Sequence, residues 1–195
     1  MTTGILYPIK GTAGQAFGRP AIRVEPTAWL LTEGVSKDRK ARWTQFSGAH
    51  QYADVHMGDD IICPIGTAVR APENGKVLRL STYRVWNPFA NGGKGAYVFA
   101  HDIWFGFGGG MLYVAHLGRP FDAGGSTAFV LREGQHALRG QRIAKTGDSG
   151  VASGAHAHAE IIQGSNPSYG AAQFRWNPKR VAVGGDLAGL AWLKP

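Results

Sequence analysis

Histidines carry the strongest chemical signal in this sequence, because three of the seven stand at even spacing from another polar side chain. His156 and His158 are separated by one residue, and residues i and i+2 of a β-strand project from the same face. His56 and Asp60 are four residues apart and also share a face if the segment is extended, whereas Asp59 would point away. Two clusters of metal-ligating or acid–base side chains are therefore expected.

The types of donor predict a zinc site. Histidine nitrogen and aspartate oxygen suit Zn²⁺, and a catalytic zinc typically takes three protein ligands and leaves one position for water. His56, Asp60 and one member of the His156/His158 pair supply that number, and spacing alone allows either histidine of the pair. Each pattern is weak by itself, but His116 in an apolar run adds a further histidine to the set.

Short apolar runs separated by glycine-rich turns predict an all-β fold. Glycine accounts for 29 of 195 residues, about twice the usual share, and tight turns between short strands would use it. The length fits one domain, and we expect a single antiparallel sheet or sandwich. The predicted strands are 60–63, 67–70, 75–80, 95–100, 111–116, 141–145 and 156–162.

Composition excludes several classes of protein. Cys63 is the sole cysteine, so no internal disulfide or cysteine-rich metal knuckle can form, and we expect a buried thiol. The N-terminus lacks a charged start followed by a long apolar run, and no run of 18 apolar residues occurs, so neither an export signal nor membrane insertion is expected. The net charge of +8 favours an anionic partner, but no basic stripe with interleaved aromatics points to nucleic acid.

Residues 1–180 are expected to form the domain, with its motifs in 56–162, and 181–195 a short C-terminal tail. Asp186 could begin a short amphipathic helix, in which Leu187, Leu190 and Leu193 recur every third residue. We expect this tail either to pack on its own domain or to dock to a partner. The stretches 23–55 and 118–130 are longer than ordinary connections between strands. Long connections in compact domains are often functional.

The motifs, in order, resemble those of the lysostaphin-type (LytM-like) zinc metallopeptidases, which cut the peptide part of bacterial peptidoglycan. The resemblance covers about residues 7–165. The runs that carry it are HMGDD at 56–60, PIGTAVRAPENGKV at 64–77, AHL at 115–117, RGQRIAKTGDSG at 139–150 and SGAHAHAE at 153–160.

This resemblance implies both a fold and a set of roles. It implies an antiparallel β-sheet or sandwich of the lysostaphin-peptidase type with long groove-forming loops. It implies that His56, Asp60 and His158 bind one Zn²⁺, and that His116 and His156 are the unliganded catalytic pair. The implied activity is that of a peptidoglycan endopeptidase, which hydrolyses a stem-peptide or cross-bridge amide.

Some positions depart from the family pattern. Val114 stands where the family usually has Tyr, with Tyr113 one residue earlier, and Ala157 and Ala159 replace bulkier apolar residues. We expect these positions to touch the groove walls and to affect the substrate, not the metal. His101 is expected at a strand end, and His50 and His136 on the surface. Five aromatic residues either line the cleft or pack in the core: Trp86, Phe89, Trp104, Phe105 and Phe107.

The expected absence of an export signal suggests a bacteriophage protein, because peptidoglycan lies outside the membrane. The chain is then a tail-associated lysin of the virion, or an endolysin held in the host cytoplasm until holin-dependent release. Its partners would be peptidoglycan and other phage tail proteins. The alternative is a non-catalytic structural or wall-binding module of the same fold in a phage tail.

Overall fold

The structure, a computed structural model, describes residues 5–6, 9–13, 59–108, 110–163, 180–181 and 192–193. Almost every element in this part is a β-strand, and all neighbouring strands but one pair are antiparallel, which confirms the predicted all-β class. The elements are β1 (Ile5–Leu6), β2 (Thr12–Ala13), β3 (Asp59–Ile62), β4 (Ala68–Arg70), β5 (Gly75–Asn87), the one-turn α3 (Ala90–Gly93), β6 (Ala96–Phe107), β7 (Gly110–Ala115), β8 (His136–Ala137), β9 (Arg142–Lys145), β10 (His156–Gln163), β11 (Arg180–Val181) and β12 (Trp192–Leu193).

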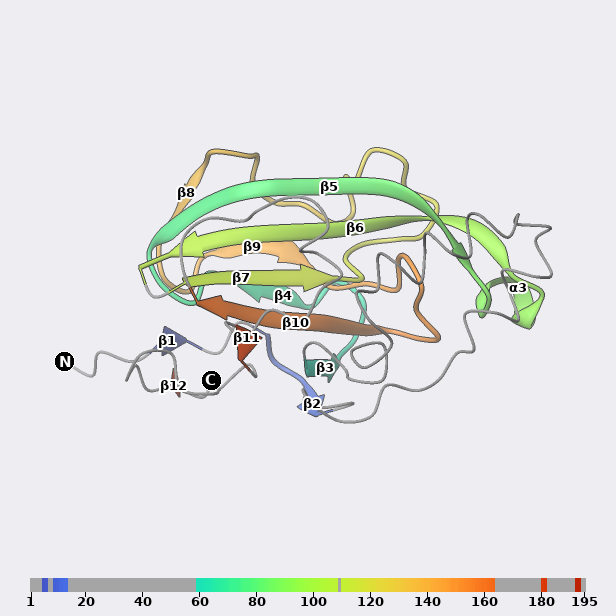
Figure 1. Cartoon of the computed structure of the whole chain (residues 1–195), viewed down its shortest axis with the longest axis horizontal. Coiled ribbons are helices and arrows are strands. Elements are labelled where there is room, and N and C mark those ends of the chain that lie inside the picture. Colours follow the sequence, from blue (N-terminus) through green and yellow to red (C-terminus); the bar gives the residue numbers. More distant parts are fainter. Residues whose placement is uncertain are drawn as a thin grey trace.

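The main sheet has the strand order β2-β3-β10-β7-β6-β5-β8, with β11 paired to β10 (Figure 1). The two-stranded β4-β9 sheet packs on one face of it, because Val69 and Ile143 share a buried cluster with Phe105 and Leu112. We call this the core face. The opposite one, which carries the candidate site, is the site face.

Alternation along β7 and β10 decides which side chains reach each face. Val114 has no exposed surface and packs in the core, as do Ala157 and Ala159. The prediction that these three residues touch the groove walls is therefore wrong. Their burial places the intervening side chains, including His158, on the site face, because successive residues of a strand point to opposite sides.

The β5–β6 hairpin continues well past β7. β5 and β6 pair from Gly75 and Phe107 to Asn87 and Ala96, whereas β7 pairs with β6 only from Ile103 onwards (Figure 1). The strand therefore runs through His101 instead of ending there, contrary to the prediction. His101 is fully buried; its Nε2–H donates to the Arg119 carbonyl at 3.2 Å, and its Nδ1 lies 3.0 Å from the Thr82 hydroxyl.

The connection after β7 is held in place by one carboxylate. Asp122 accepts hydrogen bonds from the backbone N–H and hydroxyl of Thr127, the Ser126 hydroxyl and the Gly124 N–H. These bonds, led by the one from the Thr127 backbone, lower the pKa of Asp122 to about 2. Part of the long connection predicted at 118–130 is thus a fixed turn.

Several predictions concern residues outside the described part, including His50, His56 and the stretch 23–55. Trp192–Leu193 form a strand parallel to Ile5–Leu6, so the helix expected from Asp186 does not extend to Leu193. No helix among the described residues is long and apolar enough to cross a membrane. Cys63 is buried and His136 is exposed, as predicted.

Candidate metal and catalytic site

The strand order gathers the predicted site residues on the site face. Within the main sheet, β10 lies between β3 and β7, and His158 is directly paired with Asp60 on one side and Ala115 on the other. His116 follows β7 at once and His156 stands two residues before His158. His56 lies outside the described residues, so the structure brings together four of the five predicted residues: Asp60, His116, His156 and His158.

His158 lies between two carboxylates. Its Nδ1 is 3.1 Å from Asp60 Oδ1, and its Nε2 is 3.0 Å from Glu160 Oε1. Burial lowers the pKa of His158, but the hydrogen bonds to Asp60 and Glu160 outweigh burial and raise it to about 9. Without a metal, the ring is therefore a cation that donates a hydrogen bond to each carboxylate.

This donor set suits a zinc ion. The carboxylate oxygen of Asp60 faces Nδ1 of His158, and these are two donors that zinc prefers. The carboxylate of Glu160 holds the other ring nitrogen, Nε2, as is usual for metal-binding histidines. Among the described residues no three His, Cys, Asp or Glu side chains converge as ligands. Asp60 and His158 therefore supply two donors, and a third is expected from His56.

His116 and His156 form a pair of imidazoles beside these donors. Their ring centroids are 4.5 Å apart. His116 Nδ1 donates to the Ser149 carbonyl at 2.8 Å and His156 Nδ1 donates to the Gly154 carbonyl at 2.9 Å, so Nε2 is the nitrogen left for chemistry in each neutral ring. His156 Nε2 lies 3.9 Å from Asp60 Oδ1.

His116 is held neutral by its surroundings. Burial and the nearby charges of His156 and His158 lower the pKa of His116 to about 3. Its backbone has φ +60°, a region that residues other than glycine rarely adopt and that often marks functional positions. The buried ring is therefore neutral, and Nε2 carries its unprotonated lone pair.

Sequence reasoning gave no role to several polar residues around the site. Glu160 is 4% exposed and Asp102 is 2% exposed. The alternation that placed His156 and His158 on one face applies equally to Glu160 and would have identified it. Asp102 gave only a weak signal, an acidic residue inside an apolar run; its neighbours on the site face are Tyr83 and Tyr113.

The aromatic residues divide between the two faces. Phe105 and Phe107 pack in the core, so they do not line a cleft. Trp104 packs against Tyr113 on the site face, with ring centroids 4.6 Å apart and the planes tilted by 41°. Phe89 is 43% exposed near the end of the β5–β6 hairpin.

Comparison with solved structures gives matches of low sequence identity. A zinc-containing peptidase from Vibrio cholerae is 21% identical with a TM-score of 0.48, over 82% of this chain and 37% of that one. The catalytic domain of the antimicrobial peptidase lysostaphin from Staphylococcus simulans is 16% identical with a TM-score of 0.45, over 80% of this chain and 84% of that one. A mutant catalytic domain of the prophage-encoded M23 protein EnpA from Enterococcus faecalis is 19% identical with a TM-score of 0.44, over 68% of this chain and 78% of that one.

This chain thus spans little more than a third of the Vibrio cholerae peptidase. A comparison with curated protein sequences gave no match. The model of peptidase family M23 matches residues 54–169, which include every predicted site residue. Since that match covers more than half of the sequence, the chain belongs to peptidase family M23.

Proposed function

We propose that this chain is a zinc-dependent endopeptidase that hydrolyses a stem-peptide or cross-bridge amide of bacterial peptidoglycan. The observation that carries the proposal is the arrangement around His158. One side of its ring meets Asp60, and the unliganded pair His116 and His156 lies alongside. A metal ion with acid–base groups next to it is one arrangement that can hydrolyse an unactivated amide.

When bound, zinc would polarise the scissile carbonyl and lower the pKa of a bound water to about 7. His56, Asp60 and His158 would hold the ion. The Ser149 carbonyl fixes the proton of His116 on Nδ1, so that Nε2 can accept the proton of the attacking water. His156 would then stabilise the oxyanion or protonate the departing amine.

The decisive experiment combines metal content with lysis of purified cell walls. We expect about one zinc per chain, loss of lysis in chelator and recovery when zinc is added back. Mass spectrometry of the released muropeptides identifies the bond that is cut. Full lysis by metal-free protein would refute the zinc dependence, and zinc binding without any bond cleavage would support the non-catalytic wall-binding module instead.

The setting we propose is a bacteriophage, with the chain in the virion tail or in the host cytoplasm before holin-dependent release. This proposal rests on the sequence expectation alone. We also propose residues 1–180 as the peptidase domain and 181–195 as a short C-terminal tail, whose strand β12 pairs with β1 of the same chain. Mass spectrometry of purified virions and of lysates separates the two locations, and absence from both would refute the setting.

A further inference from the structure

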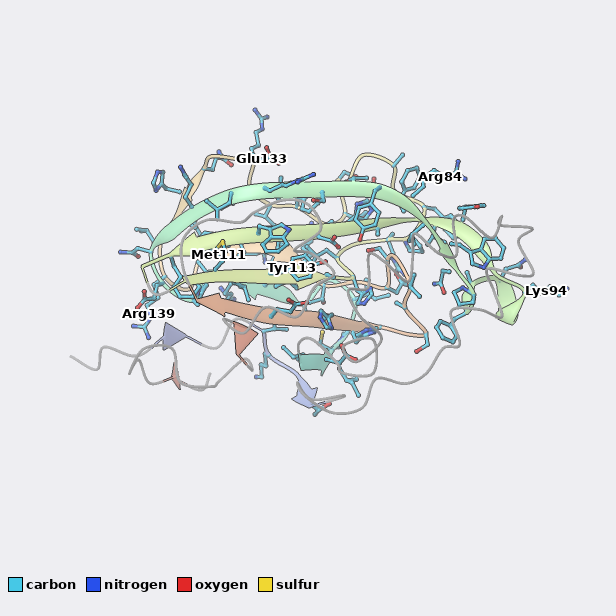
Figure 2. The ribbon with its side chains drawn as sticks, in the orientation of Figure 1. Arg84, Lys94, Met111, Tyr113, Glu133 and Arg139 are labelled. Carbon is cyan, nitrogen blue, oxygen red and sulfur yellow. The ribbon has the colours of Figure 1, made fainter. Side chains whose placement is uncertain are left out.

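Two buried carboxylates lie beside the candidate site, on the same face of the sheet, and form a second layer of side chains around it. Glu160 on β10 and Asp102 on β6 both point to the site face, and β7 runs between their strands. Tyr113 of β7 is paired with both Glu160 and Trp104, and Figure 2 shows it near the middle of the sheet. We call Glu160, Asp102 and Tyr113 the outer layer.

Burial of these carboxylates costs stability. Burial raises the pKa of Asp102 to about 6, even though hydrogen bonds from Tyr83 and Tyr113 lower it. A buried carboxyl group of this kind contributes less to the free energy of unfolding than an apolar side chain of the same size would. Buried carboxyl groups with shifted pKa values concentrate at functional sites, which favours a functional role for the outer layer.

Two residues of the outer layer, Glu160 and Tyr113, contact His158 directly. Glu160 accepts a hydrogen bond from Nε2 of His158 at 3.0 Å. The ring of Tyr113 meets the ring of His158 edge to face, with centroids 6.5 Å apart. The ring of Tyr113 also packs against Trp104 at a tilt of 41°, and its hydroxyl is hydrogen-bonded to Asp102. The imidazole of His158 is therefore constrained at Nε2 and along its edge.

We propose that Glu160 and Asp102 are positioning residues for the metal ligand His158. Glu160 holds the Nε2 proton, which leaves Nδ1 directed at Asp60, and Asp102 holds Tyr113 against the imidazole edge. The inference rests on the proposed function, because it takes His158 to be a zinc ligand. Outer partners of metal-binding histidines are typically worth 10- to 100-fold in metal affinity.

The test measures zinc affinity of metal-free protein by competition with a chromophoric chelator. Glu160→Gln keeps the shape and removes the charge, Tyr113→Phe removes the hydroxyl, and Asp102→Leu removes both acceptor oxygens. The control is Ser81→Ala, which removes a buried site-face hydroxyl that has no hydrogen-bond partner in the described part of the chain. Thermal unfolding of each metal-free variant shows whether it folds, and the visible spectrum of the Co²⁺ form reports ligand geometry.

We expect Glu160→Gln to bind zinc 10- to 100-fold more weakly, with an altered Co²⁺ spectrum. Tyr113→Phe and Asp102→Leu should each weaken zinc binding less than Glu160→Gln does. The variant that carries both changes should lose no more zinc affinity than the weaker-binding single variant, because both changes break the same contact from Asp102 through Tyr113 to His158. Ser81→Ala should bind zinc as the unmodified chain does.

Two outcomes overturn the inference: unchanged zinc affinity in a folded Glu160→Gln, or additive losses in the double variant. Asp102→Leu with Tyr113→Phe decides the matter if Glu160→Gln fails to fold. Failure of the unmodified chain to bind zinc would instead overturn the proposed function. An unmodified chain that binds zinc and lyses walls, with variants of equal affinity, would overturn the outer-layer inference alone.

Discussion

At the scale of single residues, the four described residues of the site, three histidines and one aspartate, separate into two kinds by their contacts. His158 and Asp60 face each other across 3.1 Å, as two ligands of one ion would. His116 and His156 instead turn their Nδ1 atoms to backbone carbonyls, which fixes their tautomers without a metal. We therefore expect these two kinds of residue to respond differently to mutation.

We predict that His158→Ala and Asp60→Ala lose zinc and activity together, since each removes one donor of three. His116→Ala and His156→Ala should keep zinc, while turnover falls by roughly 10² to 10⁴. Metal analysis and wall lysis on the same preparations check this, with the exposed His136→Ala as the control. Loss of metal from His156→Ala and retention by His158→Ala would reverse the assignment within the pair.

Asp102 gives a pH-dependent prediction. Its pKa is about 6 in the folded chain and 3.8 as the ordinary value, so between these values the folded chain binds one proton more than the unfolded chain. The free energy of unfolding should therefore fall as pH rises through this window, by about 3 kcal/mol for a two-unit shift. Asp102→Asn, which cannot ionise, should be more stable than the unmodified chain at pH 7 and lose most of that advantage at pH 4.

Urea unfolding of the metal-free proteins at the two pH values measures this difference. Tyr83→Phe is a useful control, because it removes a hydrogen bond to Asp102 and leaves the carboxyl group in place. An Asp102→Asn advantage of the same size at pH 4 and pH 7 would contradict the prediction.

At the scale of elements, alternation predicted that His156 and His158 share a face, and the pairing of β10 with β3 and β7 explains why that face holds the site. Alternation did not predict that β6 passes through His101. Adjacent polar residues in a strand look like its end, and here their hydrogen-bond partners lie on other segments of the chain: Arg119 for His101, and Tyr83 and Tyr113 for Asp102.

The turn after β9 comes so close to the turn after β7 that only glycine fits. A Cβ on Gly147 would clash with the backbone carbonyl of Gly118. We predict that Gly147→Ala destabilises the chain by roughly 2–4 kcal/mol and lowers turnover, because Ser149, which orients His116, lies in the same turn. Thermal unfolding and wall lysis measure both effects.

Gly154→Ala provides the matched control for Gly147→Ala. No atom of the described residues lies within 4 Å of a Cβ at Gly154, so this variant should unfold and act as the unmodified chain does. Equal stability of the two variants would show that the two turns separate at little cost.

At the scale of the whole molecule, the order of motifs was enough to predict the family and the strand class, because motifs record spacing along the chain. It did not predict the outer layer. Asp102 is buried on β6, which lies next to β5 and β7, and its hydrogen-bond partners Tyr83 and Tyr113 come from those two strands; this depends on strand order, which no local pattern contains. Burial of a polar group is a property of neighbours in space.

Net charge also belongs to this scale. The chain carries +8, and among its exposed cations Arg84 and Lys94 lie at the hairpin end of the sheet while Arg139 lies at the opposite end (Figure 2). A charge spread over the molecule attracts an anionic wall polymer through a field that salt screens, with a Debye length of about 8 Å at 0.15 M. Affinity for walls should therefore depend on ionic strength more than catalysis does.

We predict that the fraction pelleting with purified walls falls as salt rises from about 0.05 to 0.5 M, where the Debye length shrinks severalfold. Cleavage of a short uncharged peptide substrate should change little over the same range, since the site acts at contact distance. Arg84→Gln with Lys94→Gln should lower wall binding at low salt and match the unmodified chain at high salt. Pelleting that does not change with salt would mean that contacts at the site alone hold the wall, and the net charge would then have no part in recognition.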